Sequence, residues 1–451
     1  MNNQITTSLW GDEGFSAVLS QKSIPEIISI ISRDTSPPLY NLSEHLAFQL
    51  FGNSEVVIRL HSMFYFAIAI FFVYKIGAFL FGRKTGILAA TLSAFNPFFF
   101  QYAFEGRMYS ILSAGVVAST YFFCRLAFPY RDTKKLYPWN HIIGYALATS
   151  IALYSHHFAI FALFIQALWF VLTFFTKHKS LLPPMLIAFV IAGILYIPWL
   201  VPLYNQTRMV AGGFWLGTPT LGDLRELVYK YLATGTKHPF AQYGLYLTFV
   251  LILLRKWSEK FSRSIFLTLA FLGPIILTWL ISQKFQSIFY DRYLLYTIPF
   301  AMLILASNLR RISMGLWIIL IAIFAIIDIN YFTHPIKLPF RDLASFVKQT
   351  QQADDFLINW NSSSHHLWET IYYGIPAPIY LPEKGDLPFF VGTALMTQAD
   401  FAYEIPASAN RVGVVTSGSV DEIMLPGYTE SEVNNFNNLK FVWYVKTKNN
   451  K

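Results

Sequence analysis

The chain has 451 residues, of which 55% are hydrophobic, 18% aromatic and only 13% charged. A soluble domain carries about 25% charged residues, so this composition excludes a disordered chain, a coiled coil and an ordinary soluble enzyme. The single cysteine, Cys124, excludes a disulfide framework and a cysteine metal site.

Apolar runs of spanning length recur between about residues 56 and 332, which predicts a polytopic membrane protein. The predicted fold class is mainly α, a transmembrane helical bundle with a small C-terminal extracytoplasmic α/β domain. We predict ten hydrophobic segments, the second and seventh short or broken, near 56–81, 86–104, 108–128, 139–155, 157–175, 183–203, 241–254, 264–281, 293–309 and 312–332. Asn96-Pro97 interrupts the second segment near its end.

Basic residues concentrate in alternate loops, which the positive-inside rule places in the cytoplasm. The short loops on the other side carry few, namely Arg107, Lys284 and Arg292. The formal net charge of +9 therefore reflects topology, and we predict no nucleic-acid partner. The basic loop residues are Arg83, Lys84, Arg131, Lys134, Lys135, Lys177, Lys179, Arg255, Lys256, Lys260, Arg263, Arg310 and Arg311.

The predicted domains are an extracytoplasmic catalytic head at 1–55, a transmembrane domain at 56–332 and an extracytoplasmic tail at 333–451. A polar head of this size normally follows a first helix, so we expect a preceding helix to be missing. The tail alternates helix-like and strand-like segments, which predicts a small α/β layer. Its predicted helices are 342–352 and 365–373, and its predicted strands are 355–359, 379–381, 411–415 and 441–445.

Charged residues of the head supply the first candidate site. Asp12 and Glu13 follow Ser8-Leu-Trp, and Asp34 precedes a double proline that disfavours helix. A carboxylate at the membrane surface can accept a proton from an acceptor hydroxyl, or two can bind a metal. The alternative is ordinary solvated loop charge.

Three more candidate groups lie where predicted spans begin or end on the same outer side. Glu105, Arg107 and Tyr109 follow Phe98–Phe104, and the Arg107 fork suits a phosphate, although a Glu105–Arg107 pair that anchors a helix end is an equal alternative. His156 and His157 end the next outward span and point to different helix faces, so they do not form a simple metal site; a structural hydrogen bond is the alternative role. Arg292 is a second phosphate donor or a snorkelling side chain.

Six motifs in order along residues 8–310 resemble those of the GT-C glycosyltransferases. Closest are the family-39-like bacterial proteins, relatives of the protein O-mannosyltransferases and the lipid A aminoarabinose transferases. The motifs are Ser8-Leu-Trp-Gly-Asp-Glu-Gly-Phe-Ser16, Asp34-Thr-Ser-Pro-Pro-Leu-Tyr40, residues 51–55 through Arg59-Leu-His-Ser62, Glu105-Gly-Arg-Met-Tyr109, Leu153-Tyr-Ser-His-His157 and Arg292-Tyr-Leu294.

This resemblance implies a helix-enclosed cavity at the outer leaflet of the cell membrane, where a polyprenyl-phosphate sugar donor gives its sugar to an acceptor hydroxyl with inversion. Asp12 falls at the family's general-base position, with Glu13 beside it. Asp34 falls at the second acidic position, which shapes an acceptor or metal site. Arg59 matches an arginine of the family, with His61 in place of a proline.

The sequence-based prediction is thus a multi-pass membrane glycosyltransferase with Asp12 and Glu13 as catalytic residues. Its substrate-binding residues are predicted to be Asp34, Arg59, Glu105, Arg107, Tyr109, His156, His157 and Arg292. The acceptor is a lipid, a polysaccharide or a protein, and membrane lipids are further partners. No cofactor is assigned, and a divalent metal held by Asp12 and Asp34 stays open. The alternatives are a lipid or lipid-linked-sugar flippase and a non-catalytic cell-envelope assembly protein.

Overall fold

The structure, a computed structural model, describes residues 3–128, 137–174, 182–235, 237–254, 261–307, 314–360, 364–383 and 385–447. The chain divides into two compact units, each described here by itself. The bundle unit comprises residues 35–40 and 59–333. The head–tail unit comprises residues 1–34, 41–58 and 334–451.

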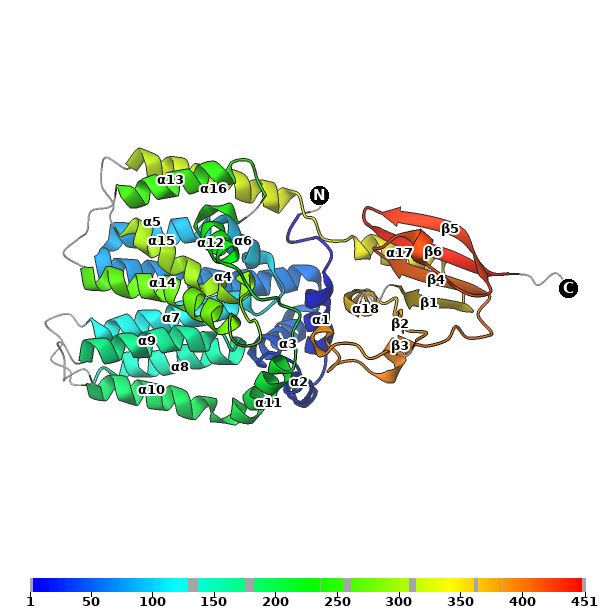
Figure 1. The fold of residues 1–451 in the computed structure, drawn as a ribbon, viewed down its shortest axis with the longest axis horizontal. Coiled ribbons are helices and arrows are strands. Elements are labelled where there is room, and N and C mark those ends of the chain that lie inside the picture. The colour runs from blue at the N-terminus through cyan, green and yellow to red at the C-terminus, as the bar shows by residue number, and fades with distance from the viewer. Residues whose placement is uncertain are drawn as a thin grey trace. The chain divides into compact units, whose positions relative to one another are not determined.

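The bundle unit consists of apolar helices that run side by side (Figure 1). Its helices are α4 (Glu55–Phe81, which starts in the head–tail unit), α5 (Arg83–Ala94), α6 (Pro97–Gln101), α7 (Tyr109–Ala127), α8 (Trp139–Ser155), α9 (Ala159–Phe174), α10 (Leu182–Tyr196), α11 (Leu200–Ala211), α12 (Leu221–Tyr229), α13 (Ala241–Leu253), α14 (Phe261–Ser282), α15 (Ile298–Ala306) and α16 (Met314–Thr333). Short turns of helix join some of them: η1 (Tyr102–Phe104), η3 (Ile197–Trp199), the π-helix η4 (Lys230–Thr234) and η5 (Asp291–Thr297).

The described helices confirm the polytopic membrane architecture. Five of them are long and apolar enough to cross a membrane, at 55–81, 109–127, 183–211, 261–282 and 314–333. A bent pair, 83–94 with 97–104, is a broken span or a re-entrant loop, and it brings the number to six if it is one span. Most of the basic residues used to predict the cytoplasmic side lie outside the described residues: Arg131, Lys134, Lys135, Lys177, Lys179, Arg255, Lys256, Lys260, Arg310 and Arg311.

The predicted interruption at Asn96-Pro97 is confirmed as a bend of 59° between α5 and α6. Proline has no backbone N–H, and at the first position of a helix this N–H would have no partner within the helix. Pro97 occupies that position in α6, and the Asn96 side chain accepts a hydrogen bond from Phe99 N at 3.0 Å. The break is therefore a capped new start of helix, which satisfies the backbone polar groups that an apolar environment would leave unpaired.

Small residues allow close helix packing in the bundle. A Cβ added to Gly115 of α7 would lie 2.7 Å from the Ala152 nitrogen of α8. A Cβ added to Gly86 would lie 2.6 Å from the Tyr74 carbonyl oxygen. Close backbone approach supplies the van der Waals contact that holds helices together where lipid removes the hydrophobic driving force.

The head–tail unit contains three helices of the predicted head: α1 (Gly11–Ser20), α2 (Ile24–Ile31) and α3 (Leu39–Phe51). Leu9, Ala17, Phe48 and Ile58 form their small buried core. The Asn41 amide donates to Ser20 Oγ at 3.1 Å, which ties α3 to the end of α1. The polar head is therefore an ordered helical structure.

The tail is the predicted α/β layer, with α17 (Phe340–Thr350), α18 (Ser364–Tyr372) and a six-stranded sheet in the order β3-β2-β1-β4-β6-β5 (Figure 1). The strands β1 (Asp355–Asn359), β2 (Ile379–Tyr380), β4 (Arg411–Thr416) and β6 (Leu439–Lys446) match predicted segments. The sequence analysis missed β3 (Phe401–Ala402) and β5 (Tyr428–Phe436). β3 is too short to show a pattern, and β5 is a mostly polar edge strand whose order comes from antiparallel pairing with β6.

Each face of the sheet has its own core. On one face, Phe340, Leu343 and Val347 of α17 pack with Leu357, Phe441 and Trp443. On the other, Ile358, Val412 and Val442 pack with Ile423 and Leu425. Alternation along β1 and β4 produces this division, because successive side chains of a strand point to opposite faces.

Candidate functional site

In the bundle unit, the loop between α6 and α7 carries two of the predicted site residues, Glu105 and Arg107, and Tyr109 begins α7. The carbonyl oxygen of Glu105 accepts hydrogen bonds from Ser62 Oγ of α4 and from Arg107 N, the latter at 2.8 Å. Glu105 is 9% exposed, and Tyr109, the first residue of α7, is 1% exposed. The loop is thus fixed at both ends, and its polar residues are held in a mostly buried setting.

Arg107, Tyr109, His156, Arg292 and Tyr293 form what we call the aromatic–arginine cluster. The Arg292 guanidinium lies over the Tyr109 ring, 5.8 Å from its centroid. The His156 ring lies 4.9 Å from Tyr293 and 6.3 Å from Tyr109, centroid to centroid. Arg107 and Arg292 both interact electrostatically with the His156 ring. Residues predicted separately from three motifs therefore meet at one place.

Two hydrogen bonds between side chains and the backbone of Phe158 connect the His156 loop to η5. The Tyr296 hydroxyl of η5 donates to the Phe158 carbonyl oxygen at 3.0 Å. Phe158 N in turn donates to Nδ1 of His156 at 3.1 Å. With Nδ1 used as an acceptor, the proton of a neutral imidazole resides on Nε2, which makes His156 a single-proton donor in the cluster.

His157 turns away from its neighbour. Its Nε2 lies 2.7 Å from Gln206 Oε1 of α11, and the Gln206 amide donates to the Ser36 carbonyl oxygen at 3.1 Å. The two histidines therefore have different partners, as the sequence analysis expected from their adjacency. The chain His157–Gln206–Ser36 fixes the segment that carries the double proline.

Arg59 is fully buried in α4, with an exposed fraction of 0%. A cation of this size is buried only with partners, and Arg59 takes part in interactions within the fold.

A cation that the sequence analysis did not select lies close to Arg292. Lys230 of η4 forms an ion pair of 2.6 Å with Asp291, the residue before Arg292. Its ammonium also lies 4.9 Å from the centroid of the Phe98 ring. The π-helix η4 packs tightly on α6, because a Cβ added to Gly235 would lie 2.4 Å from Phe98 Cβ. Lys230 is one of several charged residues between α11 and α13, so nothing in the sequence singled it out.

The head–tail unit holds the candidate carboxylates at the start of α1. Asp12 is partly exposed in the first turn. Glu13 is 0% exposed, accepts a hydrogen bond from Trp10 N at 3.3 Å and pairs with Lys337 Nζ at 2.9 Å. Asp34, after α2, is 7% exposed. The adjacent Asp12 and Glu13 thus occupy different environments, with only Asp12 accessible to solvent.

Helix α18 supplies another carboxyl that the sequence analysis did not select. Glu369 is 2% exposed, and burial first, then the charges of Glu13 and Asp12, raise the pKa of its carboxyl well above its usual range. Its Oε2 has no hydrogen-bond partner among the described residues. Its position between the buried residues Trp368 and Thr370 became visible only in the fold.

A second polar network ties the first residues of the chain to the tail. The Arg341 guanidinium pairs with Glu55 at 2.6 Å and donates to the Thr6 carbonyl oxygen at 2.7 Å. The Tyr373 hydroxyl donates to Glu55 and accepts from Leu9 N, each at 2.9 Å. Burial first, then the Glu55 charge, raises the pKa of Tyr373, which therefore stays protonated. The segment that leads into α1 is thus held by tail residues.

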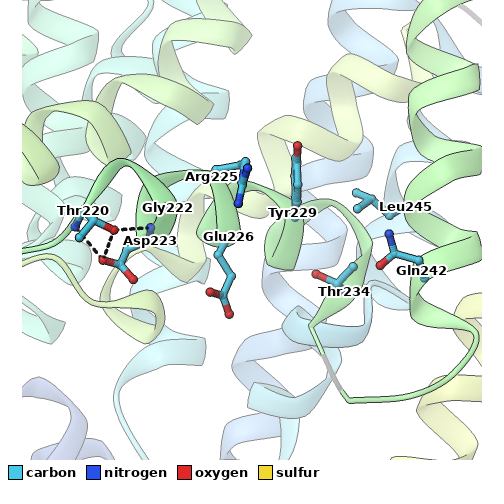
Figure 2. Close-up of a pocket in the computed structure, with 9 residues that line it drawn as sticks. All are labelled: Thr220, Gly222, Asp223, Arg225, Glu226, Tyr229, Thr234, Gln242 and Leu245. Atoms are coloured by element: carbon cyan, nitrogen blue, oxygen red, sulfur yellow. Dashed lines mark hydrogen bonds between the residues drawn. The ribbon is translucent and has the colours of Figure 1, made fainter.

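A polar surface cavity of about 360 Å³ lies beside α12 and α13 (Figure 2). The Asp223 carboxylate on its wall is engaged in capping α12, through hydrogen bonds from Thr220 N at 2.7 Å and Thr220 Oγ1 at 2.8 Å. None of the predicted site residues belongs to its lining, which consists of Thr220, Gly222, Asp223, Arg225, Glu226, Tyr229, Thr234, Gln242 and Leu245. The cavity shares η4 with the Lys230–Asp291 pair.

Within the described ranges, no group of three or more His, Cys, Asp or Glu side chains is arranged to hold a metal ion. Asp12 and Asp34 do not form such a group with a third ligand there. The metal role that the sequence left open for them therefore has no ligand set in the described residues.

The comparisons with known proteins concern the sequence and the fold. Residues 35–201 match the family described as dolichyl-phosphate-mannose-protein mannosyltransferase. A comparison with curated proteins finds no significant match.

Solved structures share the fold along nearly the whole chain. The apo structure of ArnT from Cupriavidus metallidurans has a TM-score of 0.71 at 13% identity, covering 97% of this chain and 94% of that one. The same protein bound to undecaprenyl phosphate has a TM-score of 0.66 at 13% identity, with coverages of 98% and 95%. The archaeal oligosaccharyltransferase AglB from Archaeoglobus fulgidus, in complex with an inhibitory peptide and a dolichol-phosphate, has a TM-score of 0.51 at 12% identity, with coverages of 84% and 62%.

These likenesses confirm the resemblance that the six sequence motifs indicated. The chain is a polytopic membrane protein with the fold of the GT-C glycosyltransferases.

Proposed function

We propose that this protein is a membrane glycosyltransferase that moves a sugar from a polyprenyl-phosphate donor to an acceptor hydroxyl, with inversion, on the extracytoplasmic face. The observation that carries the proposal is the aromatic–arginine cluster, in which the Arg292 guanidinium lies over the Tyr109 ring and the His156 ring contacts Tyr109 and Tyr293. The GT-C fold adds to it, since ArnT, which shares the fold, has been solved with undecaprenyl phosphate bound.

The arginines suit the phosphate of the donor. Guanidinium groups bind phosphate oxygens through paired hydrogen bonds, and these strengthen when a departing phosphate gains charge. The Arg292 guanidinium lies over the rings of Tyr109 and Tyr290, and these cation–π contacts limit the conformations that the side chain must lose on binding. A phosphate leaving group stabilised in this way needs no protonation by a general acid. Aromatic rings of the same cluster suit the faces of a sugar.

Asp12 is the proposed general base. The acceptor oxygen forms the new bond to the anomeric carbon while the bond from this carbon to the phosphate oxygen breaks. The hydroxyl proton passes to Asp12, and the electron pair leaves with the phosphate. A single displacement of this kind inverts the configuration. Asp12 is partly exposed whereas Glu13 is buried in an ion pair, which favours Asp12 for proton transfer and Glu13 for support.

Asp34, Arg59, Glu105, Tyr109, His156 and His157 stay in the proposal as substrate-binding residues or supports of them. Because Nδ1 of His156 accepts from the backbone, the ring proton of the neutral imidazole is on Nε2, which is suited to donating to a sugar or phosphate oxygen. His157 acts through Gln206 on the backbone of Ser36. The acceptor in this proposal is a lipid, a polysaccharide or a protein that carries a free hydroxyl.

The test uses the purified full chain in lipid nanodiscs with a panel of polyprenyl-phosphate sugars labelled in the sugar. Transfer of label to an added hydroxyl acceptor, with release of polyprenyl phosphate, supports the proposal. A flippase would move the intact labelled lipid between leaflets of proteoliposomes without cleaving it. Intact donor after prolonged incubation with every acceptor class, in a preparation that binds the donor, would contradict the catalytic role and favour a non-catalytic binding protein.

A further inference from the structure

We propose that Glu369, in α18 of the tail, is a positioning residue for the carboxylates at the start of α1, and for Asp12 above all. The inference rests on the proposed function, since Asp12 is the proposed base. It gives the tail a defined part in the transfer reaction, through contacts inside the head–tail unit.

Helix α18 holds the first turn of α1 at very short range. A Cβ added to Gly14 would lie 3.0 Å from the Trp368 carbonyl carbon and 3.1 Å from Glu369 N. Any larger residue at position 14 would push the two helices apart. The α1 turn that carries Asp12 is therefore seated directly on the backbone that carries Glu369.

Aromatic packing fixes the same contact from the side. The rings of Phe15 and Trp368 meet edge to face, with centroids 5.4 Å apart. The Trp368 Nε1–H donates to the Val391 carbonyl oxygen at 3.2 Å. Gly392, with a φ of +88°, leaves room for the Phe15 ring, which lies 2.8 Å from where a Cβ would be. The register of α1 against α18 is thus determined by interlocking groups.

The Glu369 carboxyl lies near two acidic side chains of α1 and near the basic side chain that pairs with one of them. Glu13 and Asp12 of α1 both interact electrostatically with it. The Lys337 ammonium, from the segment before α17, is paired with Glu13 at 2.9 Å. The carboxyl groups of Asp12, Glu13 and Glu369 and the Lys337 ammonium form a cluster. In this cluster an ionised Glu369 would repel the carboxylates of Asp12 and Glu13. A neutral Glu369 carboxyl keeps a donor O–H next to two acceptors.

An apolar side chain would fit the surroundings of Glu369 better than a carboxyl does. Its chain neighbours Leu367, Trp368 and Thr370 are all at most 1% exposed. A buried carboxyl with an oxygen that has no partner among the described residues costs stability, and an apolar replacement of similar size removes that cost. A packing role therefore predicts that leucine is neutral or stabilising without loss of activity, whereas a positioning role predicts stability retained and turnover lost.

The experiment compares Glu369→Leu, Glu369→Gln and the control Asp355→Asn in the full-length chain. Asp355 pairs with Arg411 at 2.6 Å between β1 and β4. Within the described residues, the further hydrogen bonds of this pair run to the backbone of Gln352 and Thr350, so its loss perturbs the tail. Thermal unfolding, donor KM and kcat are measured for each.

We expect Glu369→Leu to unfold at or above the wild-type temperature, with donor KM unchanged and kcat reduced about 10- to 100-fold, the cost of misplacing a catalytic group by about 1 Å. Glu369→Gln keeps the shape and a hydrogen-bond donor and should restore kcat to within about threefold of wild type. Asp355→Asn should lower the unfolding temperature and leave kcat unchanged.

Wild-type kcat in Glu369→Leu overturns the inference, as does a Glu369→Gln variant that is as slow as the leucine variant. If the leucine variant does not fold, Glu369→Met takes its place, and wild-type kcat in that variant overturns the inference equally. Absence of transfer by the wild type and by Asp355→Asn, for every donor, instead contradicts the proposed function.

Discussion

Glu13 and Lys337 form an ion pair of 2.9 Å between residues that are 324 positions apart in the chain. The Glu13 side chain is 0% exposed and that of Lys337 is 12% exposed, so the pair is nearly removed from water. One end lies in the first turn of α1 beside Asp12, and the other lies in the segment that leads into α17. The proposed base therefore depends for its local structure on the far end of the sequence.

Removal of the cation from this pair should destabilise the head–tail unit. Lys337→Met leaves the Glu13 carboxylate buried without its partner, and breaking a buried pair from one side costs about 3–5 kcal/mol. The measurement is unfolding by urea or heat in detergent, monitored by the tryptophan fluorescence of the tail. Lys22→Met, at an exposed position in the same unit, is the control and should change stability by less than about 0.5 kcal/mol. Equal stability of the two variants would show that the Glu13–Lys337 pair contributes nothing.

Asp12→Asn should abolish most sugar transfer while donor binding and folding persist. The amide keeps the shape of the side chain but does not accept a proton at neutral pH, and general-base catalysis contributes about 10²- to 10⁴-fold. Single-turnover transfer from a defined lipid donor measures the loss. Glu13→Gln should lower stability more and turnover less, because Glu13 is held in the buried pair. Glu26→Gln, an exposed carboxylate of α2, is the matched control. Near-normal turnover in Asp12→Asn would move the search for the base to Asp34.

Arg292→Ala and Arg107→Ala should each weaken binding of polyprenyl phosphate by about 10- to 100-fold, the effect of losing a hydrogen bond between charged groups. Arg292→Lys should be intermediate, because it keeps the charge but loses the forked geometry of the guanidinium that lies over Tyr109. The measurement is equilibrium binding in detergent, with thermal unfolding as a check of folding. Arg208→Ala, an exposed arginine of α11, should bind normally. If a well-folded Arg292→Ala protein binds polyprenyl phosphate with unchanged affinity, Arg292 does not bind the phosphate and has only a structural role.

Stability should fall as pH rises because of Glu369. Burial and the charges of Glu13 and Asp12 raise the folded-state pKa of Glu369 well above the ordinary value of 4.5 that applies when the chain is unfolded. Between these two pKa values the folded state binds more protons than the unfolded state, so the free energy of unfolding decreases with pH, by up to about 1.4 kcal/mol per unit. Glu369→Gln removes this dependence. Unfolding of both proteins from pH 5 to pH 8 should show a stability difference that grows in favour of the variant, and parallel curves would contradict a neutral Glu369.

Cysteine labelling tests the predicted orientation. Cys124 is buried, so the wild type should label weakly and serve as the background. Ser417→Cys in the tail and Lys22→Cys in the head are exposed and should react with an impermeant maleimide on intact cells or spheroplasts. Lys84→Cys, in a predicted cytoplasmic loop, should react only after lysis. The reverse pattern would place the head and tail in the cytoplasm.

The sequence by itself predicted most of the architecture, because the composition of each segment indicates whether it lies in the membrane or in water. Apolar runs of about 20 residues are costly anywhere but in a membrane, and every predicted span corresponds to helix in the described residues. Asn96-Pro97 marked a break that is a bend of 59°, since proline cannot continue a helix. Local pattern also identified β1 residue for residue as Asp355–Asn359. The sequence did not predict the polar edge strand β5, because its pairing with β6, and not its own composition, makes it a strand.

The sequence also named Arg107, Tyr109, His156 and Arg292 from separate motifs, because ionisable groups at a membrane interface are costly unless they are functional or paired. Only the tertiary structure brought them together, by way of the Tyr296–Phe158 hydrogen bond and the stacking of Arg292 on Tyr109. Likewise, Asp12 and Glu13 looked equivalent in the sequence, and the fold separated them by exposing one and burying the other against Lys337. Lys337 and Glu369 were invisible as site residues, because nothing local relates residue 13 to residues 337 and 369. Composition decides which segments leave water, whereas long-range packing decides which charges meet, and the chemistry proposed here depends on the second.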